Sequence, residues 1–143
     1  MAVEYSYIPL QTVAEDENLL FNDTALCCRK GAVIHRDGAG IFRIKGASNV
    51  RKSIYKVTFN ANIAVATDGT VGPISVALTE DGETINSAEA IVTPAAIGDF
   101  FNVAFSTFVV IPCGCCVTIS VRNTSDGTAI DVTNANIIID RVA

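Results

Sequence analysis

The chain has 143 residues and a net charge of −5, and half of its residues are hydrophobic. Its length fits one domain, with a hydrophobic core large enough to be stable without disulfide bonds or a structural metal ion. The acidic balance argues against nucleic-acid binding, which needs a basic surface to displace phosphate counterions. No apolar run approaches the roughly 18 residues that cross a bilayer, so no membrane partner is expected.

The mean hydropathy of +0.41 predicts a buried subunit interface, because a monomer of this composition would expose much apolar surface. The first 20 residues show neither the basic nor the apolar region of a signal peptide. We therefore expect a protein that is made and kept in a cytoplasm, or that leaves by cell lysis rather than by secretion. The basic residues crowd into residues 29–56, where we interpret them as solvated or subunit-facing charges.

Residues 1–22 are expected to form a first strand and an arm that reaches a neighbouring molecule. Apolar side chains such as Tyr5, Ile8 and Leu19 stand there among acidic residues. The main domain is expected to cover residues 23–143.

Alternation of apolar and polar residues then predicts strands along most of the chain. In residues 55–65 the odd positions from Tyr55 to Val65 are apolar, and Lys56, Thr58, Asn60 and Asn62 share the other face. Similar alternation marks residues 74–79, 103–111 and 117–123, and residues 134–143 are typical of a last strand. Residues 87–100 could supply one helical turn at most.

Turn sequences separate these runs, including Asp-Gly pairs that begin at Asp37, Asp68, Asp81 and Asp126. Short strands between such turns predict an all-β fold, an antiparallel β-sandwich or jelly roll.

The five cysteines lie in two clusters, Cys27–Cys28 and the stretch IPCGCCVTI. Neither spacing matches a structural zinc site, and no metal ligand set is expected. A disulfide, within the chain or between subunits, and a cluster of reduced thiols both stay open for Cys27, Cys28, Cys113, Cys115 and Cys116. Strand alternation would place Cys115 in the core beside Val117, with Cys113 and Cys116 exposed or in a disulfide bridge.

The sequence contains no motif for catalysis or cofactor binding. The only histidine, His35, has no motif around it, and we interpret it as a surface residue on a strand. We therefore expect no enzyme activity, no catalytic residues and no cofactor.

The segments GIFRIKG (40–46), YKVTFNANIAV (55–65) and GPISVALTEDGE (72–83) resemble the middle strands of TNF/C1q-like jelly-roll domains. The chain from residue 102 onward resembles the bacterial form found at the tips of collagen-like spore-surface proteins. In that form a V-x-V-x-N strand is followed by an N-A-x-I-x-I-x-R strand. The matching residues are Val117, Ile119, Val121, Asn123, Asn134, Ala135, Ile137, Ile139 and Arg141.

This sequence departs from the bacterial pattern in the cysteine-rich turn at residues 112–116 and in having no Gly-X-Y stalk before the domain. The whole chain also resembles short standalone proteins of phages and prophages.

This second resemblance implies a non-enzymatic structural protein of a virion, such as a capsid decoration or head-fibre protein. Its partners would be the major capsid protein or another virion protein. The alternatives are a cell-surface or carbohydrate-binding module and a spore-surface protein.

TNF/C1q-like domains are as a rule homotrimers packed through an aromatic and aliphatic face. The resemblance therefore implies a trimer here. The aromatic residues expected in that interface or in the core are Tyr55, Phe59, Phe101, Phe105 and Phe108.

Overall fold

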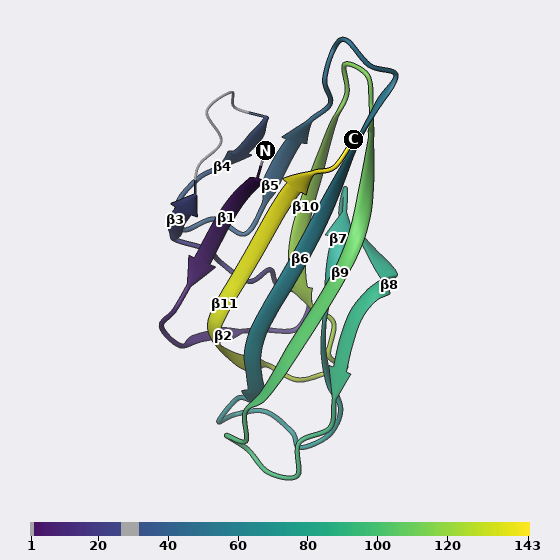
Figure 1. The fold of residues 1–143 in the computed structure, drawn as a ribbon. Helices are drawn as coiled ribbons and strands as arrows, with labels where there is room; N and C mark the ends of the chain where they lie inside the picture. The colour runs from purple at the N-terminus through teal and green to yellow at the C-terminus, as the bar shows by residue number, and fades with distance from the viewer. Residues whose placement is uncertain (1, 27–31) are drawn as a thin grey trace.

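The computed structural model describes residues 2–26 and 32–143. Two antiparallel β-sheets pack face to face, and the strands run along the long axis of the sandwich (Figure 1). None of the described residues forms a helix long and apolar enough to cross a membrane.

The first sheet contains six strands. Five of them follow the order β3-β1-β11-β6-β9, and β2 pairs with the start of β11. Their bounds are β1 Ala2–Tyr7, β2 Gln11–Val13, β3 Asp23–Leu26, β6 Lys52–Val65, β9 Phe101–Pro112 and β11 Ile130–Arg141.

The second sheet contains five strands in the order β4-β5-β10-β7-β8. Their bounds are β4 Val33–His35, β5 Phe42–Lys45, β7 Ile74–Glu80, β8 Glu83–Val92 and β10 Cys116–Asn123. The edge strands β8 and β9 contact each other, so the two sheets approach along this side of the sandwich. This arrangement confirms the predicted antiparallel jelly-roll sandwich.

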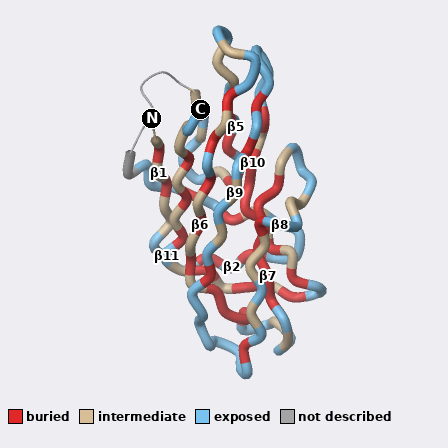
Figure 2. Tube along the Cα trace, turned by 45° about the vertical axis from the view of Figure 1, so that its right-hand side comes forward, coloured by how far each residue is buried: buried red, intermediate tan, exposed pale blue. Residues whose placement is uncertain are grey.

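The core lies between the sheets and follows the alternation read from the sequence (Figure 2). Every odd residue of β6 from Tyr55 to Val65 is buried, whereas Lys56 is exposed on the opposite face. β7 differs, because Ser75, Ala77 and Thr79 on its outer face are buried as well. The buried hydroxyls of Ser75 and Thr79 are satisfied by hydrogen bonds to the hydroxyls of Thr124 and Ser120, respectively.

The N-terminal segment is part of the sandwich. β1 pairs with β11 on one side and with β3 on the other. Val3, Tyr5, Leu19 and Phe21 from this segment are buried in the core. The expected first strand is thus present, and an arm that reaches a neighbouring molecule stays a prediction.

Residues 83–92 form a strand that the sequence did not predict, since their side chains show no clear alternation. A two-residue turn at Asp81 and Gly82 joins this strand to β7, with φ angles of 51° and 87°. Two consecutive positive φ angles are the requirement of a type I′ hairpin, which suits the twist of the paired strands. No helical turn is present in the described loop at residues 93–100.

Candidate functional site

The five aromatic residues expected in the core or the interface fall into two groups. Tyr55 and Phe59 are buried between the sheets. Phe105 faces inward as well, with its ring centre 5.1 Å from that of Phe59, but it is only half buried because β9 is an edge strand.

Phe101 and Phe108 lie at the surface of β9, with exposed fractions of 44% and 62%. Phe108 points away from the core because it has the opposite parity to the buried residues Val109 and Ile111. An aromatic ring this exposed on an edge strand is a candidate contact for another molecule. Its place in a subunit interface stays a prediction.

The outward side chains of the neighbouring strands β6 and β9 share one surface, which we call the β6–β9 face. Cross-strand pairs place Ile54 opposite Val110 and Lys56 opposite Phe108. The twelve residues of this face are Lys52, Ile54, Lys56, Thr58, Asn60, Asn62, Asn102, Ala104, Ser106, Phe108, Val110 and Pro112. Lys52 and Lys56 are its two charged residues, and both lie in the half of the face that carries Phe108 and Val110.

The apolar end of the β6–β9 face continues onto the C-terminal residues. The backbone of Val142 donates a hydrogen bond to the carbonyl oxygen of Ile54 at 2.9 Å. Val142 and Val110 are 48% and 47% exposed. Phe108, Val110 and Val142 are therefore apolar side chains that are exposed to water in the single chain.

The other end of the β6–β9 face is polar but uncharged. The amide of Asn102 donates to Oδ1 of Asn62 at 3.1 Å, and the amide of Asn62 donates to Oδ1 of Asn134 at 3.5 Å. The Thr58 and Ser106 hydroxyls lie 3.4 Å apart. These groups bond to one another across the strands, so covering them with a second surface would leave fewer polar atoms unpaired.

The sequence had assigned Asn60 and Asn62 to one strand face but had not identified that face as a site. Their signal was the run of uncharged polar residues that follows Lys56 on the polar side of a long strand, since water-exposed strand faces commonly carry charges. Ile54, Val110 and Val142 were missed because each stands next to another apolar residue, where polarity does not distinguish the two faces of a strand.

The three described cysteines, Cys113, Cys115 and Cys116, are all exposed and free. The prediction that Cys115 packs in the core is wrong. β10 begins only at Cys116, and Cys115 belongs to a turn that its backbone closes by donating to the carbonyl oxygen of Pro112 at 3.1 Å. Strand alternation therefore does not apply to Cys115. Cys27 and Cys28 lie outside the described residues.

His35 is half buried rather than on the surface, which corrects the interpretation from sequence. Its ring stacks on Phe42 with the centres 4.3 Å apart, and its Nε2 lies 2.9 Å from the carbonyl oxygen of Ala39. A histidine held in this way packs against the core and has one nitrogen engaged by the backbone. No group of three or more His, Cys, Asp or Glu side chains is placed to hold a metal among residues 2–26 and 32–143.

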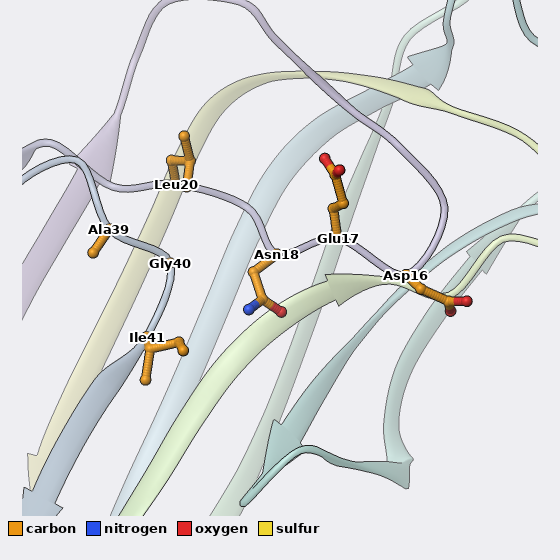
Figure 3. Close-up of a pocket in the computed structure, with 7 residues that line it drawn as sticks. All are labelled: Asp16, Glu17, Asn18, Leu20, Ala39, Gly40 and Ile41. Atoms are coloured by element: carbon orange, nitrogen blue, oxygen red, sulfur yellow. The ribbon is translucent and has the colours of Figure 1, made fainter.

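A shallow hollow of about 480 Å³ lies between residues 16–20 and 39–41 (Figure 3). The carboxylates of Asp16 and Glu17 point in different directions there, so they do not form a shared cation site. Leu20 and Ile41 contribute exposed apolar side chains to its rim. The described residues that line this hollow form no combination of groups that indicates catalysis or ligand binding.

No protein-family model matches the chain, and no curated protein sequence matches it. Solved structures of the same fold do match. A TNF-family Eiger protein from S. frugiperda has 14% identity and a TM-score of 0.66, with coverage of 100% of this chain and 92% of the other. Murine APRIL has 10% identity and a TM-score of 0.65, with coverage of 98% and 99%.

The globular domain of a zebrafish complement 1qA protein has 10% identity and a TM-score of 0.60, with coverage of 99% of this chain and 94% of that domain. The chain therefore has the TNF/C1q-like fold over its whole described length. At these identities the likeness concerns the fold alone.

Proposed function

We propose that the protein is a non-enzymatic structural protein that assembles into a homotrimer and forms part of a virion. A capsid decoration or a head-fibre protein fits this role. The observation that supports the assembly is the β6–β9 face, which has no acidic residue, has only two charged residues, and carries the exposed apolar side chains of Phe108 and Val110. Apolar side chains exposed to water raise the free energy of the single chain, and a second copy can cover them.

Symmetry favours copies of the same chain as the covering partners. Most soluble oligomers are closed and cyclic, and closure leaves no apolar surface free to extend the assembly. The exposed residues Phe101 and Phe108 lie on the edge strand β9, where a neighbouring subunit can contact both the edge and the β6–β9 face.

The virion role rests on the resemblance of the sequence to standalone phage and prophage proteins, and the fold is compatible with it. A closed trimer presents its end loops outward, where they can attach to a capsid or face the medium. A structural role also agrees with His35, the only histidine, which packs on Phe42.

Two measurements test this proposal. Sedimentation of the purified chain under reducing conditions should give three times the monomer mass, and a monomer would refute the assembly. Quantitative mass spectrometry of purified phage particles from a host that carries the gene should find the protein at a fixed ratio to the major capsid protein. Its absence from intact particles would refute the virion role while leaving the trimer untouched.

A hydroxyl-rich pocket of about 400 Å³ favours carbohydrate binding as a second candidate function. It lies between residues 70–75 and 124–128, with Ile91 on its wall. The hydroxyls of Ser75 and Thr124 lie 2.7 Å apart, and the Asp126 carboxylate also lines the pocket. Hydroxyls and a carboxylate beside an exposed aliphatic wall can bind a sugar ring. A glycan array that gives no signal with the assembled protein would dispose of this candidate.

A further inference from the structure

The turn between β9 and β10 presents three thiols at one end of the sandwich. Cys113, Cys115 and Cys116 are all exposed. Gly114 between them has a φ of +71°, which the tight turn requires. The proposed trimer surface does not include these residues, so their chemistry needs a separate explanation.

A second loop, residues 46–51, holds this turn in place beside it (Figure 1). The backbone of Cys113 donates to the carbonyl oxygen of Arg51 at 2.9 Å, and Gly46 donates to the carbonyl oxygen of Cys115 at 3.0 Å. A Cβ atom at Gly46 would lie 2.4 Å from the carbonyl oxygen of Pro112. The two loops are therefore in direct contact, and the thiols stand on a supported turn.

The same pairing brings cations to the thiols. Lys45 lies opposite Cys116, and Lys52 lies opposite Pro112. A guanidinium nitrogen of Arg43 donates to the sulfur of Cys116 at 3.4 Å. The exposed cations around the turn are Arg43, Lys45, Arg51 and Lys52. We call the turn 112–116 and these four residues the basic thiol tip.

The basic thiol tip is a local exception in an acidic protein. Residues 43–56 and 109–122, which supply its strands and loops, contain no Asp or Glu, although the whole chain carries a net charge of −5. The carboxylate of Asp81 does accept from Thr118 of β10, two residues beyond Cys116, so one acidic group lies near the four cations. The excess of cations creates a positive potential that concentrates anions from solution. The potential also disfavours contact between two such tips, so a second copy docked tip to tip is not the expected partner.

We propose that the basic thiol tip is a site of thiol–disulfide exchange with anionic disulfides, and that Cys115 is the attacking thiol. The Cys113 sulfur donates to the carbonyl oxygen of Ser48 at 3.4 Å, and the Cys116 sulfur accepts from Arg43. The sulfur of Cys115 has no hydrogen-bond partner among the described residues. It is thus the thiol that is free to approach a reagent.

The exchange is balanced without any further oxidant. Cys115 releases its proton to solvent, and its sulfur forms a bond to one sulfur of the disulfide. The bond between the two reagent sulfurs breaks, and the second sulfur leaves as a thiolate with the electron pair. The product is a mixed disulfide at the tip, by which the protein would be joined covalently to an acidic partner that carries a disulfide.

The test compares two disulfide reagents of different charge on the full, reduced chain. Dithiobis(nitrobenzoate) is a dianion, and dithiodipyridine is neutral. In the variant K45Q/R51Q/K52Q the rate constant for the dianion should fall by about tenfold at low salt, because the steering charge is lost. The rate for the neutral reagent should change little. Raising the salt should slow the wild type toward the variant with the dianion only.

The attacking thiol is identified by substitution and by peptide mapping. Cys115→Ser should abolish the fast reaction, whereas the matched variant Cys113→Ser should retain it. Trypsin separates the two cysteine clusters, because residues 57–122 contain no Lys or Arg before Arg122 and residues 1–29 contain the other pair. First labelling within residues 1–29 would overturn the assignment, as would an unchanged ratio of the two rates in the charge variant. The salt series on the wild type decides the question if the variant fails to fold.

Discussion

Phe108 on β9 lies directly opposite Lys56 on β6, and its ring is 62% exposed on the β6–β9 face. Val110 lies two residues further along the same strand and is 47% exposed. Neither side chain contributes to the buried core. Substitutions here should therefore separate assembly from folding.

The double variant F108S/V110S should sediment as a monomer at concentrations where the wild type is a trimer. Loss of two apolar contacts per interface weakens association by about 2–4 kcal/mol, which is a factor of about thirty or more in the dissociation constant. Ile34→Ser is the matched control, because Ile34 is 44% exposed but lies on β4 of the other sheet. A double variant that assembles like the wild type would show that the β6–β9 face is not the interface.

Asn123 should be essential for stability, because its buried side chain joins three segments. Its amide nitrogen donates to the carbonyl oxygens of Val13 at 3.0 Å and Thr128 at 3.1 Å. Its Oδ1 accepts from the backbone of Ser125 at 2.9 Å. Asn123→Ala would leave these backbone groups unpaired in the interior.

Urea denaturation of Asn123→Ala should therefore show a loss of about 3 kcal/mol or more in the free energy of unfolding. Asn86→Ala removes the same side chain from an exposed position on β8 and should change stability little. Similar midpoints for the two variants would contradict the role of Asn123 as a buried link.

Gly82 should resist replacement by any other residue. Its φ of +87° in the β7–β8 turn strains an L-residue, although no atom would block an added Cβ. Gly82→Ala should lower stability by about 1 kcal/mol through backbone strain alone. Gly72→Ala is the control, since Gly72 has open space and no positive φ. The thermal midpoints of the two variants measure the difference, and equal midpoints would count against the type I′ turn.

Glu80 should make stability depend on pH. Burial, and secondly the Asp81 carboxylate, raise the pKa of Glu80 above its usual value. The Glu80 carboxyl group of the folded chain therefore binds its proton more tightly than the same group in the unfolded chain does. The Glu80 contribution to stability is present at low pH and is lost as pH rises from the unfolded pKa through the folded pKa.

Glu80→Gln removes this titration, so the variant should be at least as stable as the wild type at neutral pH. As the pH is lowered through the same window, the free energy of unfolding of the wild type should rise relative to that of the variant. Urea midpoints across a pH series measure the difference between them. Glu83→Gln, at an exposed carboxylate across the same turn, controls for the loss of one negative charge. A Glu80→Gln variant that is less stable than the wild type at neutral pH would exclude the effect.

The sequence by itself determined the long strands and the class of fold. In residues 55–65 the alternation assigned both faces of β6 correctly, because successive side chains of a strand point to opposite sides whatever it pairs with. The Asp81–Gly82 pair likewise marked a turn, since few residues accept positive φ angles. These features are local, and local chemistry is enough to predict them.

Only the tertiary structure decided which outward faces stay exposed and which segments meet. Ser75 on β7 and Lys56 on β6 both lie on the outer side of their strands, yet Ser75 is buried beside Thr124 and Lys56 is exposed. Cys115 is exposed and not buried in the core as predicted, because it belongs to the tight turn and the strand begins only at Cys116. The cations around the thiols come together through pairing between segments about 70 residues apart. Such long-range pairing depends on the whole fold, so no local pattern in the sequence could reveal it.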